Sequence, residues 1–295
     1  MNDQAQSLRN LVSLREKLAD QTRIRTPARI ITVTSGKGGV GKSNFSLNFA
    51  LALKSLGRKV LIFDADIGMA NIDVLMGVRP RYSLYHLLKG ERDISEIIEL
   101  GTQAVPFIAG GSGMADLFSL SESDLDYFTS QIERISDEMD YIIFDTGAGL
   151  SKETLKFITS ADDCFIVTTP EPTSITDAYA LIKVVHGIDP DVGFSLVINR
   201  VNGEGEARQV ADKISLVAKQ FLNLDIPTLG YLSDDSHVMQ AVKKQVPFSA
   251  AFPGCAASRD IKRLAMKYMD VPRERSNETL SGIKGFMHKW LRRAK

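Results

Sequence analysis

The stretch that decides the fold is Ser35-Gly36-Lys37-Gly38-Gly39-Val40-Gly41-Lys42-Ser43. It follows an apolar run at residues 30–33 and precedes an amphipathic run at residues 44–56, which predicts a strand, a glycine-rich loop and a helix. Residues 36–43 fit G-x-x-x-x-G-K-[ST], a phosphate-binding loop whose backbone N–H groups and helix N-terminus attract a polyphosphate. The pattern assigns Lys42 to the β- and γ-phosphates and Ser43 to Mg²⁺. The other predicted contacts come from the loop itself, at Gly36, Lys37, Gly38, Gly39, Val40 and Gly41.

Length and composition allow one large α/β domain or two small ones. The chain has 295 residues, 44% of them apolar, with 36 basic and 36 acidic side chains. This balance gives no general attraction to nucleic acid, and none is expected as a partner. Cys164 and Cys255 stand far apart without metal-ligand spacing, which fits a reducing cytosol. We divide the chain into a leader at 1–29, a nucleotide-binding domain at 30–270, and a linker with a C-terminal helix at 271–295.

Apolar strands alternate with helical patterns through the predicted domain. The alternation predicts an α/β fold with a doubly wound, mostly parallel sheet flanked by helices, and ligands at the carboxyl ends of its strands. The expected strands are Ile30–Thr34, Lys59–Asp64, Val105–Ala109, Tyr141–Asp145, Cys164–Thr168, Phe194–Asn199 and Pro227–Leu232. The expected helices are Lys42–Leu56, Glu122–Glu138, Lys152–Thr159, Ser174–Val185, Glu206–Phe221, His237–Gln245 and Ala256–Tyr268.

Polar residues at three of these strand ends are candidate site residues. Asp64 and Asp66 follow the second strand, where carboxylates can orient an attacking water or support a metal, or simply cap the next turn. Asp145 ends four apolar residues in the Walker B pattern and is expected to hold Mg²⁺. Asn199 ends a later strand, and the sequence alone explains it equally well as a site residue or as an ordinary turn residue.

Lys37 indicates a family. It is a second lysine, directly after the first glycine, and with it the loop resembles the deviant Walker A motif of the MinD/ParA dimerising ATPases. The alternative is a solvated loop lysine. The resemblance implies an ATP-bound homodimer in which Lys37 reaches the partner's nucleotide. It also implies that Asp66 positions the attacking water and that Asp64 supports the Mg²⁺ site. After the Walker B strand this family usually has Asp-x-Pro-x-Gly, whereas this chain has Asp145-Thr146-Gly147-Ala148-Gly149 and lacks the proline.

The same resemblance covers the base-binding end of the site. It implies that Asn199 reads the adenine edge and that Arg200 stacks or pairs nearby. The guanine-reading N-K-x-D signature is not apparent, which favours ATP over GTP.

The leader carries leucines at helical spacing, namely Leu8, Leu11, Leu14 and Leu18, and could be a flexible tail or a peptide that orders on a partner. Residues 3–9 resemble the D-Q-A-x-x-L-R element of the flagellar, FlhG-type branch of this family. The resemblance implies that the leader binds the GTPase FlhF and stimulates its GTP hydrolysis, and that the protein contacts flagellar switch-ring (C-ring) proteins. Gln4 is the main candidate contact, with Asp3, Ala5, Leu8 and Arg9.

The last sixteen residues form a basic, amphipathic segment without acidic residues. Its apolar residues fall within an arc of roughly 140° on a helix, as in helices that lie on anionic membranes. An ordinary helix packed on the domain is the alternative, and docking could alternate with release on ATP binding. The predicted membrane-facing residues are Leu280, Ile283, Phe286, Met287, Trp290 and Leu291.

Together these features predict an Mg²⁺-dependent ATPase that acts as a slow switch controlling flagellar number and placement. Lys37, Lys42 and Asp66 are its expected catalytic residues. It is expected in the cytoplasm, and on the inner face of the cell membrane in its ATP state. One alternative is a MinD- or ParA-like ATPase that positions cell division or DNA cargo. Another is a metabolic P-loop enzyme, although the iron-protein type would require clustered cysteines.

Overall fold

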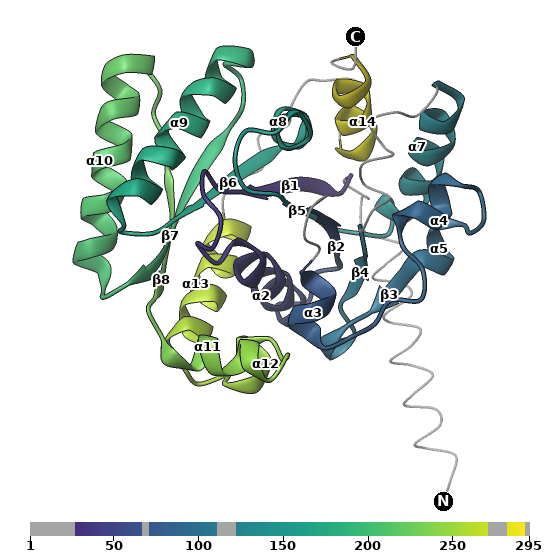
Figure 1. Ribbon diagram of the computed structural model, residues 1–295, viewed down its shortest axis with the longest axis horizontal. Helices are drawn as coiled ribbons and strands as arrows, with labels where there is room; N and C mark the ends of the chain where they lie inside the picture. The colour runs from purple at the N-terminus through teal and green to yellow at the C-terminus, as the bar shows by residue number, and fades with distance from the viewer. Residues whose placement is uncertain (1–26, 67–70, 111–121, 271–281, 293–295) are drawn as a thin grey trace, which may run out of the picture.

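The computed structural model describes residues 27–66, 71–110, 122–270 and 282–292 (Figure 1). Its sheet has eight strands in the order β3-β4-β2-β5-β1-β6-β7-β8, and β3 pairs antiparallel with β4 while the other pairs are parallel. The strands are β1 (Arg29–Thr34), β2 (Val60–Ala65), β3 (Ile98–Leu100), β4 (Pro106–Ile108), β5 (Tyr141–Thr146), β6 (Asp163–Thr168), β7 (Phe194–Val201) and β8 (Thr228–Ser233). The predicted doubly wound, mostly parallel α/β fold is confirmed.

Helices cover both faces of the sheet. Alternate side chains of a strand point to opposite faces, so Ile31 and Val33 of β1 join one core while Ile30 joins another. The first face is covered by α2 (Lys42–Ser55), α3 (Ile72–Met76), α11 (Ser236–Lys243), α12 (Phe248–Ala251) and α13 (Ala256–Asp270). The second is covered by α4 (Leu84–Leu88), α5 (Ile94–Ile97), α7 (Glu122–Ser136), α8 (Lys152–Ser160), α9 (Pro172–Ile188), α10 (Glu204–Leu222) and α14 (Gly282–Arg292).

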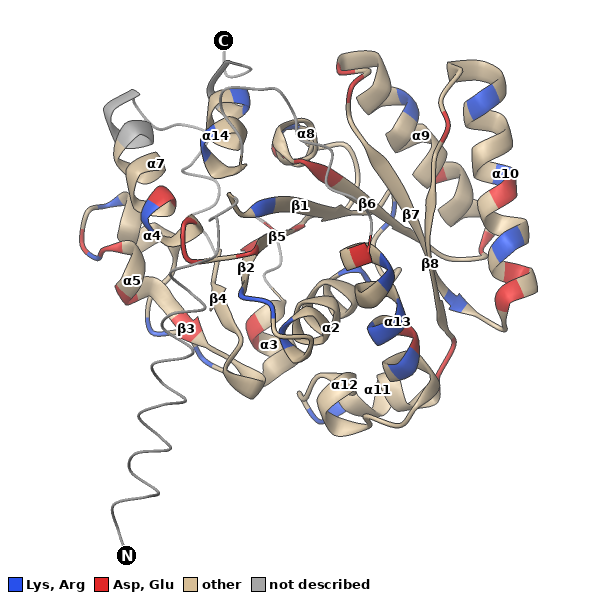
Figure 2. Ribbon diagram, turned by 180° about the vertical axis from the view of Figure 1, so that it is seen from behind, with Lys and Arg blue, Asp and Glu red and all other residues tan. Residues whose placement is uncertain are grey.

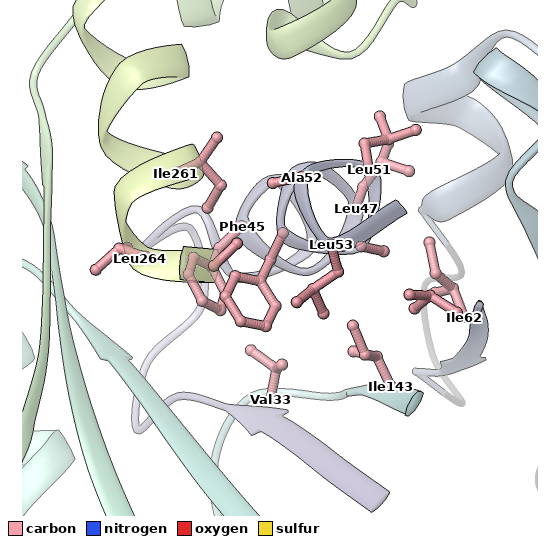
Figure 3. Packing of buried hydrophobic residues seen from close by; sticks show 14 of the residues in the cluster. Val33, Phe45, Leu47, Leu51, Ala52, Leu53, Ile62, Ile143, Ile261 and Leu264 are labelled. Carbon is pink, nitrogen blue, oxygen red and sulfur yellow. The ribbon is translucent and has the colours of Figure 1, made fainter. Parts of the chain in front are cut away.

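Helix α2, which begins in the phosphate-binding loop, is buried nearly all round. It lies between the sheet, represented by Val33 and Ile143, and helix α13, represented by Ile261 and Leu264 (Figure 3). A helix that is apolar on every side is typical of a core position. The loop is therefore held between a fully buried strand and a fully buried helix, which fixes its position.

The sequence predicted seven strands and the seven longer helices of the domain, with ends within a few residues. It missed β3, α3, α4, α5 and α12, which have three to five residues each and are too short to show a periodic pattern. A short 3₁₀ turn, Thr102–Ala104, was also missed.

Helix α13 protects the outer edge of β8, the last strand of the sheet. Lys267 Nζ donates to the Thr228 carbonyl at 3.0 Å, and Asp260 accepts the Ser233 backbone N–H at 2.8 Å. These two side chains occupy backbone groups that would otherwise be open to another strand.

The C-terminal helix α14 packs on the domain in this structure, against α7, α8 and β1. Ile283, Phe286, Met287 and Trp290 are each at most 4% exposed. Trp290 contacts Phe157 of α8, with 4.5 Å between ring centroids. The predicted apolar stripe is thus covered by protein here, in the packed alternative, and lipid could reach it only after release. Among the described residues, no helix is both long and apolar enough to cross a membrane.

Candidate functional site

The phosphate-binding loop lies where β1 ends and α2 begins. A Cβ at Gly36 would stand 2.3 Å from the Asp177 backbone of α9, so only glycine fits there. Gly41 has a φ of +90° and precedes α2 without any side-chain cap. The first N–H groups of α2 are therefore available to a ligand at the positive end of the helix.

A cleft of about 780 Å³ opens beside this loop. It brings together the loop, the end of β2 and the segment after β5, which the sequence placed at one edge of the sheet. Its lining includes Gly38, Gly39, Lys42, Ser43, Asp66, Gly147, Ala148 and Arg200. Ser43 is half-buried in this lining, on the first turn of α2.

Lys42 and Asp145 form a buried ion pair inside the site. Lys42 Nζ donates to Asp145 Oδ1 at 3.0 Å, and Ser46 Oγ donates to the same oxygen at 2.7 Å. Asp145 is fully buried, and its Oδ2 has no hydrogen-bond partner among the described residues. A buried carboxylate oxygen without a donor is costly, and it suits a hydrated cation at this place.

Asp64 lies at the end of β2 next to Asp145, and it is buried. Its Oδ2 accepts the backbone N–H groups of Asn71 at 2.9 Å and Ile72 at 3.0 Å, so it caps the start of α3. Burial and the charge of Asp145 raise the pKa of Asp64 to about 7. The structure thus gives Asp64 the capping role, and its support of a metal site stays a prediction.

Asp66 and the segment after β5 face each other across the cleft. A Cβ at Gly147 would lie 3.5 Å from Asp66 Oδ1. Gly149, with a φ of +87°, donates its N–H to the Ser35 carbonyl of the phosphate-binding loop at 2.9 Å. The segment after β5, which includes Ala148, is therefore tied to the phosphate-binding loop and lines the same cleft.

Lys37 points away from this cleft. Its Nζ donates to Glu171 Oε2 at 2.8 Å and to Thr173 Oγ1 at 3.0 Å, at the start of α9. The hydrogen bond from Lys37 lowers the pKa of Glu171. Lys37 therefore makes no contact with its own phosphate cleft here, and the predicted contact with a partner's nucleotide stays a prediction.

A second cleft, of about 620 Å³, continues from the loop toward β7 and α11. Asn199 and Arg200 line it, as expected for a base-binding end. The amide of Asn199 is engaged, however: Nδ2 donates to the Val40 carbonyl at 2.7 Å and Oδ1 accepts the Arg200 N–H at 3.0 Å. In this structure Asn199 holds the phosphate-binding loop through its hydrogen bond to Val40. Recognition of adenine by Asn199 stays a prediction.

These residues fit a nucleotide with Mg²⁺. The open backbone at Gly38 and Gly39, the uncapped start of α2 and the cation of Lys42 match a polyphosphate. Ser43, together with the unpartnered Asp145 Oδ2, offers the oxygen ligands that Mg²⁺ prefers. Lys42, which Asp145 holds in place, is positioned to turn toward bound phosphates.

Several predicted residues lie outside the described part of the chain. These are Asp3, Gln4, Ala5, Leu8 and Arg9 of the leader, Leu280 of the last segment, and the side chain of Leu291.

Three residues of the site were not predicted. Glu171 and Thr173 follow β6 at the same edge as the phosphate-binding loop, so their position after a strand was the available signal. Ser46 lies one helical turn after Lys42, which places both side chains on one face of α2.

Comparisons with known proteins agree with this geometry. A family described as "AAA domain" matches residues 28–198. The chain is 35% identical to the flagellum site-determining protein YlxH of Helicobacter pylori over 302 residues, which covers 99% of both chains. It is 37% identical to the antiactivator FleN of Pseudomonas aeruginosa over 241 residues, covering 82% of this chain and 86% of FleN.

A solved structure of the septum site-determining protein MinD from Pyrococcus horikoshii, complexed with Mg-ADP, has the same fold. Its TM-score is 0.68 at 23% identity, covering 83% of this chain and 97% of that one. The chain therefore belongs to the MinD/ParA family of ATPases, in the branch that includes FleN and YlxH.

Proposed function

We propose that the chain is an ATP-dependent dimerising switch that controls flagellar number and placement and binds membrane in its ATP state. The observation that carries the proposal is the place of α14. Its apolar face packs on the residue before Asp145 and on α8, the helix that follows the segment at Gly147 and Gly149. A ligand in the phosphate cleft and the docked helix α14 would therefore act on the same two elements, β5 and α8.

Release of α14 would present a membrane-binding surface. The helix carries Lys284, Lys289 and Arg292 and no acidic residue. Figure 2 shows basic positions and no acidic position on the described part of α14. Release of the helix would expose Phe286 and Trp290. Basic helices with aromatic and aliphatic residues on one face bind anionic lipid surfaces. One such helix binds weakly, while two in a dimer bind more strongly because the second contact is intramolecular.

Dimerisation would use the edge of the sheet that carries the phosphate cleft. Lys37 is held at this edge by an exposed ion pair with Glu171, which contributes little energy and can be exchanged for a contact with the partner's phosphates. Asp66 would then align water, and catalysis would rest on positioning and charge neutralisation by Lys37, Lys42 and Mg²⁺.

The names of the relatives support the flagellar role, because YlxH is a flagellum site-determining protein and FleN an antiactivator. We infer that the leader binds the GTPase FlhF through Gln4 and its neighbours and stimulates GTP hydrolysis. Contact with flagellar switch-ring proteins is a further part of the proposal. A MinD-like role in cell division is the alternative, although the match to YlxH extends over the leader as well.

Co-sedimentation with anionic vesicles tests the switch. An Asp66→Ala chain, which should retain ATP, is expected to sediment with vesicles in ATP and to stay in solution in ADP. Adding Trp290→Asp should abolish the ATP-dependent binding. A matched control is Leu216→Asp on α10, where the side chain is 68% exposed. Equal binding in ATP and ADP would contradict the proposal.

A separate experiment tests the leader. The Gln4→Ala substitution should reduce stimulation of FlhF without changing vesicle binding.

A further inference from the structure

We propose that the groove under α14 is a shared docking site, and that the leader of the same chain, at residues 8–18, occupies it when α14 leaves. The proposal rests on the release of α14 described above. It makes the two ends of the chain compete for one surface, so that membrane binding withdraws the leader from other partners.

The groove is apolar and aromatic. Phe63, Phe144 and Phe157 form its floor, and Phe128 and Ile132 of α7 form its wall. Together with α14 these residues enclose a cavity of only about 10 Å³, at most the space of one water molecule, so a helix with an apolar stripe fills the groove almost completely.

An empty groove would be unfavourable in water. Phe63, Phe144 and Phe157 are each at most 2% exposed while α14 is docked. Releasing the helix would uncover these rings together, and a contiguous apolar patch of this kind calls for a new partner.

The leader enters the described structure at the groove. A Cβ at Gly282, the first residue of α14, would stand 2.7 Å from Pro27 Cβ and 3.0 Å from the Ala28 carbonyl oxygen. Pro27, the first described residue of the leader, therefore lies at the end of the groove where α14 starts. Residues 19–26 can span about 26 Å when extended, while a helix over residues 8–18 is about 16.5 Å long. The chain is long enough for the leader to reach any part of the groove.

The leader has the apolar pattern that the groove accepts. Leu11, Leu14 and Leu18 are spaced by three and four residues, as Ile283, Phe286 and Trp290 are in α14. Both segments therefore present one apolar stripe when helical, and a leader helix entering from residue 27 would run antiparallel to α14.

The charges at the groove also match. Glu133 pairs with Lys284 of α14 at 3.5 Å. Burial raises the pKa of Asp162, and the charge of Lys289 in α14 offsets part of that rise. These two carboxylates would lose their lysines when α14 leaves. Residues 8–18 carry Arg9, Arg15 and Lys17 against a single acidic residue, Glu16, so the leader can replace the lost positive charge.

Hydrogen exchange on the full-length chain tests the inference. Trp290→Asp places a charge in the groove and should eject α14, which is checked by faster exchange of residues 282–292. The leader amides at 8–18 should then exchange about tenfold more slowly than in the unaltered chain. Adding Leu11→Asp and Leu14→Asp should remove this protection, and Leu216→Asp on α10 should leave both segments unchanged.

A second experiment releases α14 from the groove without any substitution. The unaltered chain is mixed with ATP and anionic vesicles, and protection at 8–18 should again increase. If α14 loses protection in either arm while the leader gains none, the shared groove is wrong, although the membrane switch stands. If vesicles leave α14 docked, the proposed switch fails, and the Trp290→Asp arm still decides whether the groove takes the leader. Protection of 8–18 while α14 is docked would also overturn the inference.

Discussion

The ring of Phe286 is stacked on the ring of Phe144, with 4.9 Å between their centroids and 6° between their planes. Phe144 directly precedes Asp145 on β5, and their side chains point to opposite faces of the sheet. One face of this strand therefore contacts the C-terminal helix, while the other holds Lys42 through Asp145. A shift of β5 on nucleotide binding would therefore change the contact with Lys42 on one face and the contact with α14 on the other.

Shortening Phe286 should loosen α14 from the domain. Phe286→Ala removes three aromatic contacts, with Phe144, Phe157 and Trp290, and a change of this kind costs about 3 kcal/mol. Trp290 is the only tryptophan, so its emission should shift to longer wavelength as the helix leaves. Circular dichroism should show that the remaining fold is kept. Val184→Ala on exposed α9 is the matched control, and an unchanged emission would contradict tight docking.

Asp66 should be needed for turnover and not for binding. Asp66→Ala is expected to lower the ATPase rate at least about a hundredfold, because it removes the carboxylate that is proposed to align the attacking water. Nucleotide affinity, measured by calorimetry, should stay within a few-fold, since Lys42 and the loop backbone are intact. Glu204→Ala on α10 serves as the control. Full turnover by the Asp66→Ala chain would remove the assigned role.

Lys37 and Glu171 should affect dimerisation differently. Lys37→Ala, in an Asp66→Ala background, should keep the ATP-loaded chain monomeric in light scattering. Glu171→Ala should leave dimerisation equal or stronger, because it releases Lys37 from a competing partner and the exposed pair contributes little to stability. Equal dimerisation of the Lys37→Ala chain would exclude the contact across the interface.

Stability of the nucleotide-free protein should fall as the pH rises from about 4 to 7. Asp64 has a folded pKa of about 7 against an ordinary value of 3.8, so the folded state binds more protons in this window. The loss is at most about 4 kcal/mol on the linkage relation. Urea unfolding at pH 5 and pH 7 measures it, and Asp64→Asn should flatten the dependence. A steady rise in stability across this window, absent from the Asp64→Asn chain, would contradict a raised pKa.

The sequence predicted what local pattern determines. The phosphate-binding loop, the seven parallel strands and the long helices follow from periodicity and glycine placement within short windows. Side-chain partners that come from distant segments were not predictable. Asn199 reaches Val40 across 159 positions, and the aromatic rings that cover α14 come from β5 and α8. An amphipathic stripe reveals that a helix has an apolar partner, and it does not reveal whether that partner is lipid or protein.

The two hydrogen bonds from α13 to the edge of β8 have a consequence for how copies of this protein can meet. With Thr228 and Ser233 already engaged, the sheet cannot be extended by a neighbour at that side, and fibre-like stacking of copies is suppressed. Self-association is thereby directed away from the β8 edge, and the ends of the strands, where a closed pair can form and come apart again, remain open to it.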